Sequence, residues 1–517
     1  MRANKTLYIT PIIITIILLQ VSFFEAKQSI RIRTTLFEHQ QENFITLLWT
    51  VRLGEIWGTP LICDYNSDGE YEIIVPSITG LHIISSSGEL IGTITFEELP
   101  PPFGDALAYD VDDDGIKEII IGSHARDTTA MINLYIIDPE NKTFEKIIPL
   151  EYAWCIHPGL SIGDINNDGR IEIIFCVAKY WEENTGTMYV IDPQTGRIHW
   201  FYIFDNLPGL GPALYDVDND GKFEIFVSDG DVWTYEGNVF CFDDNGSLLW
   251  TTSLDDDVRP YLILADLNND NVSEVIATDW WGYHVRALDS RTGEILWTFT
   301  AEGYVRNTPA VADLDNDGTK EVIFISGDGY VYAINGYDGT LKWKRYIGVK
   351  NPARTLAPVV ADLDGDKLLE IIVGNGENRM VCILLNNGTI RAVIPFNDSI
   401  IWTPQVFDID NDNHFELIIA VNDTVYAFRI LANKGEIIWE NPRVNEFGRR
   451  CDKIRAETQL QPPTSQQLLP EIRITDLTPV LLYILVLIIM IEIILVLFVV
   501  KETRHKQNEV YWGRIKS

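Results

Sequence analysis

The stretch DLDNDGTKEVIFI, which begins at Asp313, has the residue types and spacing of a metal-binding loop. Asp313, Asp315 and Asp317 alternate around one tight turn, and Gly318 supplies the positive φ that such a turn requires. Glu321, the ninth residue, can close the ring of oxygen ligands. Because Ca²⁺ takes roughly six to eight oxygen ligands, we predict a calcium-binding loop. The apolar run that follows is typical of a buried strand, whereas an EF-hand loop is flanked by helices and ends in Glu at about position 12.

The same arrangement of oxygen-bearing side chains occurs eight times, and successive first aspartates lie 46–54 residues apart. The predicted ligands are Asp64, Asn66, Asp68 and Glu72; Asp110, Asp112, Asp114 and Glu118; Asp164, Asn166, Asp168 and Glu172; Asp216, Asp218, Asp220 and Glu224; Asp266, Asn268, Asp270 and Glu274; Asp313, Asp315, Asp317 and Glu321; Asp362, Asp364, Asp366 and Glu370; Asp408, Asp410, Asp412 and Glu416. A period near 50 residues with short strands is typical of a propeller or another repeat array. The sequence therefore predicts up to eight structural Ca²⁺ ions, and a solvated turn without metal is the alternative at each loop.

Three of the eight loops lack the glycine at position six, where Asn271, Lys367 and Asn413 stand instead. A Cβ in the left-handed region costs roughly 1 kcal/mol, and a lysine adds positive charge. We therefore expect metal less often in these three loops than in the five that keep glycine.

Four strand signals accompany each loop, as in TPAVAD, EVIFIS, YVYAIN and TLKWKRY of the sixth repeat. Short strands with turn signals at this spacing indicate antiparallel blades. We predict an all-β fold in which residues 45–441 form an eight-bladed β-propeller. Two segments, ITLLWTV at 45–51 and GEIIWEN at 435–441, both resemble an outermost strand, and either could complete the last blade.

A second motif, Gly-x-x-x-Trp, recurs at the fourth strand. It is found at Gly196–Trp200, Gly246–Trp250, Gly293–Trp297, Gly339–Trp343 and Gly435–Trp439. A tryptophan at constant depth in the outer strand can pack against the next blade and bury roughly 150–250 Å². An aromatic platform for sugars is the alternative.

Two family resemblances follow from these motifs. The acidic loops resemble the FG-GAP/VCBS repeats of integrin-α-like propellers, although their ninth residue is Glu here and usually Asp in that family. The element ALDSRTGEILW at 287–297 resembles the tryptophan-docking motif of eight-bladed quinoprotein-like (PQQ-like) propellers. Both resemblances imply a propeller. Quinoprotein dehydrogenases also carry an adjacent Cys–Cys pair over the cofactor, which this sequence lacks, so the resemblance implies the fold without PQQ.

The chain of 517 residues has 75 acidic and 40 basic residues, for a formal net charge of −35. Nucleic-acid binding needs stripes of Lys and Arg, so this balance argues against it. The six cysteines show no zinc-binding spacing. Cys155 and Cys176 lie in one repeat, at positions where two strand ends should meet, and we predict a disulfide between them. Buried free thiols are the alternative.

Both ends of the chain contain apolar runs. Residues 1–27 predict a signal peptide or an uncleaved anchor, followed by a lead-in at 28–44. Residues 442–478 indicate a stalk, residues 479–500 a transmembrane helix interrupted only by Glu492, and residues 501–517 a basic cytoplasmic tail. We therefore predict a single-pass protein of the cell membrane with the propeller outside, and a second span if the N-terminal run is retained. Six sequons suit an exported glycoprotein: Asn141, Asn245, Asn271, Asn387, Asn397 and Asn422.

The face opposite the acidic loops is the predicted binding surface. Arg259, Arg306 and Arg354 come from consecutive repeats at the entry to the innermost strands, and His157 has the equivalent place in the third repeat. Converging arginines favour an anion such as a uronate, a sulfate or a partner's carboxylate, and pairing with the acids at 255–257 is the alternative. Aromatic residues that protein and glycan contacts favour lie in nearby loops, at Tyr180, Trp181, Trp233, Tyr235, Trp280, Trp281 and Tyr283. Packing within the loops is their alternative role.

We interpret the chain as a membrane-anchored, extracellular, calcium-binding propeller that acts as an adhesion or recognition module for an extracellular protein or an anionic glycan. No sequence motif indicates an enzyme. A polysaccharide lyase, with His157 and the arginines acting on a uronate, is one alternative. A scaffold in a membrane complex, working through Glu492 and the stalk, is another.

Overall fold

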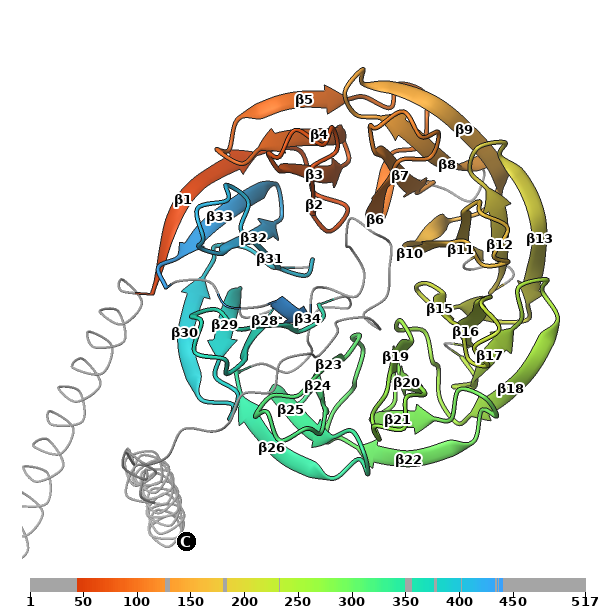
Figure 1. Ribbon diagram of the computed structural model, residues 1–517, viewed down its shortest axis with the longest axis vertical. Helices are drawn as coiled ribbons and strands as arrows, with labels where there is room; N and C mark the ends of the chain where they lie inside the picture. Colours follow the sequence, from red (N-terminus) through yellow and green to blue (C-terminus); the bar gives the residue numbers. More distant parts are fainter. Residues whose placement is uncertain are drawn as a thin grey trace, which may run out of the picture. The chain divides into compact units, whose positions relative to one another are not determined.

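The computed structural model describes residues 44–439, with gaps at 126–130, 180–183, 232, 349–355, 376–378, 401, 433–434 and 436. These residues lie in a compact unit, Glu38–Ile454. They form eight antiparallel sheets arranged in a ring (Figure 1), so the prediction of an all-β eight-bladed propeller is confirmed.

Each blade has strands A to D, from the innermost to the outermost. Blade 1 contains β2 (Leu61–Cys63), β3 (Glu72–Ser77), β4 (Gly80–Ser85) and β5 (Leu90–Ile94); blade 2 contains β6 (Pro102–Tyr109), β7 (Glu118–Ser123), β8 (Met131–Asp138) and β9 (Thr143–Tyr152). Blade 3 contains β10 (Cys155–Gly163), β11 (Glu172–Lys179), β12 (Thr185–Asp192) and β13 (Arg197–Phe204); blade 4 contains β14 (Leu207–Pro208) and β15 (Ala213–Tyr215) as strand A, then β16 (Glu224–Gly230), β17 (Gly237–Phe242) and β18 (Leu248–Leu254).

The remaining blades repeat this order. Blade 5 contains β19 (Ile263–Ala265), β20 (Glu274–Thr278), β21 (His284–Leu288) and β22 (Ile295–Thr300); blade 6 contains β23 (Ala310–Ala312), β24 (Glu321–Ile325), β25 (Tyr330–Asn335) and β26 (Leu341–Tyr346). Blade 7 contains β27 (Val359–Ala361), β28 (Glu370–Asn375), β29 (Met380–Leu384) and β30 (Ile390–Pro395), with β34 (Ile437–Trp439) added; blade 8 contains β31 (Gln405–Phe407), β32 (Glu416–Val421), β33 (Thr424–Ile430) and β1 (Ile45–Arg52).

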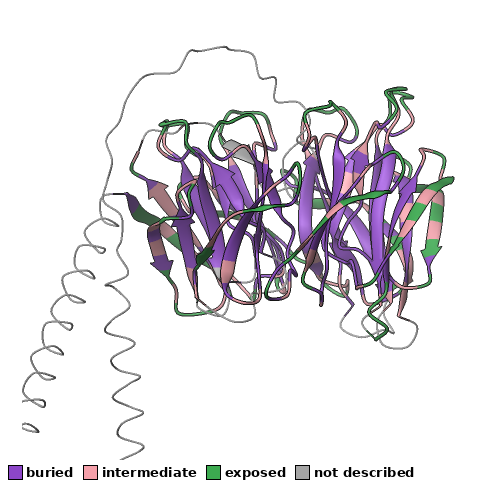
Figure 2. Ribbon diagram, turned by 90° about the horizontal axis from the view of Figure 1, so that it is seen from below, coloured by how far each residue is buried: buried purple, intermediate pink, exposed green. Residues whose placement is uncertain are grey.

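The position of each strand in its blade follows its residue pattern. Strand β24, EVIFI, is buried along its whole length, as expected of a strand covered by neighbouring blades on both faces. Strand β22, ILWTFT, alternates exposed and half-buried residues because one face of an outermost strand meets solvent. Figure 2 shows this contrast between the buried inner strands and the partly exposed outer ones.

Strand β1 closes the ring. It pairs antiparallel with β33, from Ile45 opposite Ile430 to Arg52 opposite Thr424, and so becomes the outermost strand of blade 8. Of the two segments that could have closed the propeller, the one at 45–51 does so. The segment at 435–441 does not form an outer strand, because β34 pairs with β27, the innermost strand of blade 7.

Tryptophans in the outer strands join each blade to the next one, as the repeated motif predicted. The indole nitrogens donate to carbonyls in the following blade at 2.7–3.0 Å: Trp49 to Ser86, Trp200 to Asp244, Trp250 to Ser290, Trp297 to Gly336 and Trp343 to Asn386. The fifth tryptophan of this set is Trp49 of the closing strand.

Each of these rings lies over a glycine of the next blade. At Gly339 a Cβ would lie 2.7 Å from the Trp297 ring, and φ is +70°. At Gly318, φ is +88° but a Cβ would meet nothing within 4 Å. The two glycines thus share a left-handed backbone and differ in the space beside them.

Gly339→Ala should lower the stability of the propeller far more than Gly318→Ala. Both changes place a Cβ in the left-handed region, at about 1–2 kcal/mol, but only the first also displaces an indole, which typically adds about 1–3 kcal/mol. Thermal unfolding of the purified full-length variants measures the difference. Equal decreases in melting temperature for the two variants would show that the Trp297 indole moves aside at no measurable cost in stability.

Tyr261, in the loop before β19, links blades that are not neighbours. Its hydroxyl donates to Asp105 of β6, 156 residues earlier, at 2.9 Å. The ring passes Gly159 and Gly211, where a Cβ would lie 2.1 and 2.8 Å from its Cε1. Glycine is needed at these two places for space, and the side chain reaches from blade 5 past blades 4 and 3 to blade 2.

The predicted disulfide between Cys155 and Cys176 is wrong. Both are buried free thiols, as are Cys241 and Cys382. Strand β11 continues to Lys179, so Cys155 lies opposite Ala178 and the two cysteines pack in different apolar clusters. Cys451 lies outside the described residues.

The predicted signal segment, stalk, transmembrane helix and basic tail, with Glu492, also lie outside the described residues. Among the residues that are described, no helix has the length and apolarity needed to cross a membrane.

Candidate metal loops and a candidate binding face

The eight acidic loops connect strands A and B at one end of the blades. In the loop of blade 6, Asp313 accepts hydrogen bonds from the backbone amides of Asp317 (3.1 Å) and Gly318 (2.9 Å), and Asp317 accepts one from Thr319 (2.8 Å). The other loops repeat these bonds with small variations, for example at Asp64, Asp110, Asp164, Asp216 and Asp266. The first and third aspartates of this loop therefore hold the turn through backbone amides.

The sixth residue of each loop has a positive φ whether or not it is glycine. Asn271, Lys367 and Asn413 adopt φ values of 67°, 69° and 73°, in the same region as the glycines of the other loops. Asparagine enters this region more readily than most residues. Neighbouring loops are also connected, since Asn269 donates to Gly318 O and Asn316 to Lys367 O, both at 2.7 Å.

The ninth-position glutamate is the first residue of every strand B and is buried in every blade. One carboxylate oxygen accepts the backbone N–H of the residue after the first aspartate, at 2.7–3.1 Å in blades 2 to 8. The other oxygen, Oε1, accepts a hydrogen bond from Asn166 in blade 3, from Asn268 in blade 5 and from a basic side chain in blades 6 to 8. In blades 2, 4, 6 and 7 this glutamate, the first Asp and the third residue bring ligand atoms within 4.8 Å of one another.

Burial raises the pKa of these glutamates. The pKa of Glu118 rises from 4.5 to about 7, chiefly because the carboxylate loses water, and the Asp112 and Glu145 charges add to the effect. Glu72 and Glu274 show the same shift to about 7, with burial again the largest cause. The protein thus holds glutamates that are costly to ionise unless a positive charge is near.

The donor set suits a hard cation. All predicted ligands are carboxylate or amide oxygens, the groups that Ca²⁺ prefers. In the described part of the chain, Oε1 of Glu118 is buried without a hydrogen-bond partner, although Glu118 is 0% exposed. A buried, unpaired carboxylate oxygen at the rim of an acidic loop fits the calcium that the sequence predicts.

Basic side chains reach three of the loops, which sequence reasoning missed. Lys342 lies 2.8 Å from Asp315 and 2.7 Å from Glu321 in blade 6, and Arg391 lies 2.7 Å from both Asp364 and Glu370 in blade 7. In blade 8 Arg429 pairs with Asp410, with Asp412 at 2.8 Å and with Glu416 at 2.9 Å. The signal was present in two cases, because Lys342 and Arg391 directly precede the tryptophan position of strand D.

The opposite face is formed by the B–C loops and the connections between blades. Arg259 is 4% exposed and donates to both oxygens of the fully buried Asp257 at 2.7 Å. The alternative of pairing with the acids at 255–257 therefore holds for Arg259, and its charge is balanced inside the protein. It also lies 4.9 Å from the centre of the Trp280 ring.

Arg306 comes from the next connection and joins the same group. It is 6% exposed, donates to Trp280 O at 3.0 Å and lies 3.7 Å from the Trp281 ring centre and 4.7 Å from that of Tyr304. Arg259 and Arg306 thus support one loop, and Arg354 and Trp181 lie outside the described residues. Trp280 is buried, so of the predicted tryptophans Trp233 is the one that is highly exposed, at 75%.

His157 is not placed for proton transfer at a surface site. It is 2% exposed, and its Nδ1 lies 2.9 Å from Gly209 O. Complete burial lowers the pKa of His157 to about 4, and the nearby Arg259 adds to this effect. The imidazole is therefore neutral near pH 7 and contributes to packing between blades 3 and 4.

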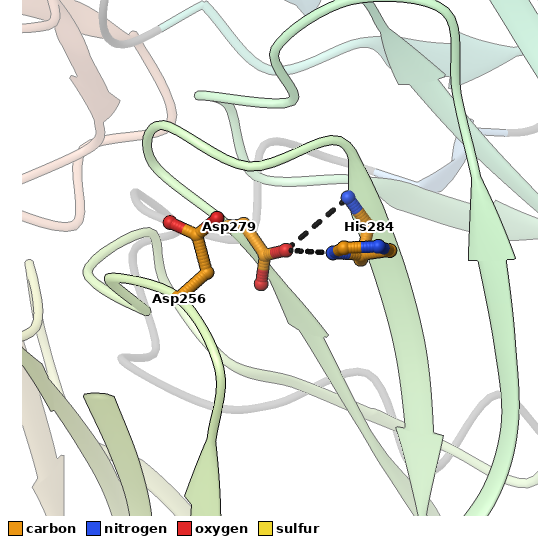
Figure 3. A group of neighbouring side chains, drawn as sticks. All are labelled: Asp256, Asp279 and His284. Atoms are coloured by element: carbon orange, nitrogen blue, oxygen red, sulfur yellow. Dashed lines mark hydrogen bonds and ion pairs between the residues drawn. The ribbon is translucent and has the colours of Figure 1, made fainter. Parts of the chain in front are cut away.

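A second cluster of titratable groups, which sequence reasoning did not identify, lies on the same face. Asp256, Asp279 and His284 approach one another in blade 5, with His284 Nδ1 2.7 Å from Asp279 (Figure 3). Their side chains could hold a metal ion. Arg286 already pairs with Asp279 and with Asp255, however, so the cluster contains its own cation.

Comparison with known proteins supports the fold. A family model described as "Outer membrane protein assembly factor BamB" matches residues 184–441. The structure of Sqt1 from Saccharomyces cerevisiae is similar with a TM-score of 0.53 at 11% identity, covering 75% of this chain and 99% of that one. None of the curated proteins matches the sequence.

Two further solved structures are similar at lower scores. BamB from Moraxella catarrhalis aligns with a TM-score of 0.49 at 17% identity, covering 75% of this chain and 100% of that one. The V. cholerae biofilm matrix protein Bap1 aligns with a TM-score of 0.43 at 15% identity, covering 77% and 92%. Residues 184–441 therefore contain PQQ-like repeats within the eight-bladed propeller. The resemblance of the acidic loops to FG-GAP repeats stays a prediction.

Proposed function

We propose that the protein is an exported, membrane-anchored recognition propeller that holds structural calcium on one face and binds a partner protein with the other. The match to the BamB family model supports a protein-binding role, since that name describes an assembly factor. The apolar runs at both ends of the sequence support the membrane anchor.

The observation that carries the proposal is the exposure of three aromatic residues on a face that also holds buried ion pairs. Trp233, Tyr235 and Tyr283 are 75%, 53% and 42% exposed in the B–C loops of blades 4 and 5. Two buried ion pairs lie on the same face, Arg259 with Asp257 and Arg286 with Asp279. Exposed aromatics on a pre-organised support are what protein contact sites favour, because little side-chain entropy is lost on binding.

The charges on this face favour a basic partner segment over an anion. Asp205 and Glu236 are exposed on this face, whereas Arg259 and Arg306 are buried and Asp255 already pairs with Arg286. Lys and Arg side chains can pair with the carboxylates and stack on the aromatic rings. We therefore expect a partner protein with an exposed basic segment, and an anionic glycan is the less favoured ligand.

A photo-cross-linking residue placed at Trp233 in the full-length chain should capture one defined protein in the producing cells. The same residue at Tyr337, which is 68% exposed on the face of the acidic loops, is the matched control and should not. Tyr283→Ala combined with Tyr235→Ala should reduce the cross-link at position 233 by about tenfold or more, which corresponds to losing about 1.4 kcal/mol of binding free energy. Equal cross-linking at both positions, or none at either, would contradict the proposed surface.

A further inference from the structure

The acidic loops fall into two groups that differ in what their ninth-position glutamate contacts. In blades 6, 7 and 8, the free oxygen Oε1 of Glu321, Glu370 and Glu416 accepts a hydrogen bond from a basic side chain at 2.7–2.9 Å. In blade 2, Oε1 of Glu118 is buried without a hydrogen-bond partner among the described residues. The same buried carboxylate is thus neutralised internally in one group and left for a ligand in the other.

The basic side chains contact several of the predicted metal ligands at once. The ammonium group of Lys342 lies between Asp315, Asp317 and Glu321, at 2.8, 3.6 and 2.7 Å. In blade 8 the guanidinium of Arg429 uses its three nitrogens on Asp410, Asp412 and Glu416. These are the positions from which carboxylates would bind an ion at the centre of the loop.

In the first five blades, the residue at the strand-D position of Lys342 is neither Lys nor Arg. By the pairing of strands C and D, Lys342 and Arg391 correspond to Ile91 in blade 1, Glu145 in blade 2, His199 in blade 3, Leu249 in blade 4 and Leu296 in blade 5. Leu249 and Leu296 are about half exposed and directed away from the core, at 54% and 48%. Blades 1, 2, 4 and 5 therefore have no strand-D cation at this position. In blade 3, His199 Nε2 lies 3.7 Å from Glu172 Oε1, farther than the direct 2.7 Å contacts of Lys342 and Arg391.

We propose that Lys342, Arg391 and Arg429 are permanent substitutes for the metal ion, and that calcium binds only in the loops of blades 1 to 5. The inference deepens the proposed function and depends on its calcium-binding part. A divalent cation cannot share the centre of a loop with an ammonium or guanidinium group because like charges repel at such short range. A built-in cation satisfies the carboxylates without any ion from solution.

This inference favours different loops from those that the glycine pattern favoured among up to eight. By the glycine pattern, calcium is expected more often in blade 6, with Gly318, than in blade 5, with Asn271. By the cation contacts, blade 5 binds and blade 6 does not. The two alternatives are therefore distinguished by variants of single loops and not by the total number of ions.

The test is to count calcium ions bound to the purified full-length protein by native mass spectrometry and by elemental analysis, with the wild type expected at five. Lys342→Met should add one ion, and Asp266→Asn in blade 5 should remove one. Lys344→Met is the matched control on the same strand, because Lys344 pairs with Glu302 outside the loop. It should leave the number at five.

The reverse variant keeps the test decisive if Lys342→Met does not fold. Leu296→Lys places an ammonium group beside the loop of blade 5 from a half-exposed position and should lower the number of bound ions by one. An unchanged number for Leu296→Lys, or eight ions in the wild type, would overturn the inference and leave the calcium proposal standing. No bound calcium in the wild type would instead refute the calcium part of the proposed function.

Discussion

Calcium should raise the melting temperature of the full-length protein by about 10 °C or more near pH 8, and by much less near about pH 5.5. A ligand present at about 100 times its Kd contributes about 2.7 kcal/mol per site, and five such sites are proposed. Each kcal/mol shifts the melting temperature of a domain of 150–250 residues by about 2–4 °C, and somewhat less for a larger one. Even partial occupancy of the calcium sites should therefore raise the melting temperature by a large amount.

The pH dependence follows from the buried glutamates. Without metal, the pKa of Glu118 is about 7 in the folded protein, against 4.5 in the unfolded chain. Between these values the folded state keeps a proton that the unfolded state has lost, so stability falls as pH rises from about 4.5 to about 7. Above this range the ionised glutamates are most costly, and calcium compensates most. At lower pH, calcium must displace protons.

Thermal melts with calcium or with a chelator, at the two pH values, measure this prediction. Magnesium at the same concentration is the control for ionic strength, because it demands a stricter octahedral geometry. A melting temperature that does not respond to calcium near pH 8 would contradict the structural role of the loops. A response of equal size at both pH values would contradict the role of the glutamates.

Removing the closing strand should abolish cooperative folding of the propeller. Deletion of residues 44–52 leaves blade 8 with three strands and exposes the edge of β33, including Tyr426 and Phe428. It also removes the Trp49 contact that joins blade 8 to blade 1. An open ring with an unpaired apolar edge is prone to aggregation, so we expect loss of the thermal transition and of the monomeric fraction in size-exclusion chromatography.

A circular permutant provides the control for this deletion. Ile45 pairs with Ile430, so a short hairpin can join the end of β33 to the start of β1. A chain that begins at residue 53, with 45–52 fused behind residue 431 through a short turn, should recover a cooperative transition. If the deletion alone unfolds cooperatively at the wild-type temperature, β1 is not the strand that holds the ring closed.

Much of the fold could be predicted because the repeat is local and in phase. Eight acidic loops, each followed by an apolar run, gave the number of blades, and the tryptophan motif gave the contact between neighbouring blades. Closure could not be predicted, because Trp49 and Trp439 have similar local sequences and only long-range strand pairing separates them. The disulfide failed for a similar reason, since β11 extends beyond Cys176 and moves Cys155 opposite Ala178.

The ion pairs of the candidate site were harder to predict from the sequence, because they depend on the direction in which each side chain points. The position of Arg259 was predictable, but its enclosure by Asp257 was one of two alternatives. The positions of the loops were predicted from the acidic motif and its glycine. That motif does not include Lys342 and Arg391, which lie about 30 residues later on strand D and contact the loop glutamates. Arg429 reaches its loop from strand C, where the motif offers no fixed position.

The reach of Tyr261 has a mechanical consequence for the ring. A propeller connected only between adjacent blades can deform toward an oval by small rotations at each contact. The hydrogen bond from Tyr261 to Asp105 spans three such contacts. Blades 2 and 5 therefore cannot separate unless this bond breaks or the Tyr261 ring moves away from Gly159 and Gly211. The sector from blade 2 to blade 5 is thereby stiffened, and it includes the loops that carry Trp233 and Tyr283.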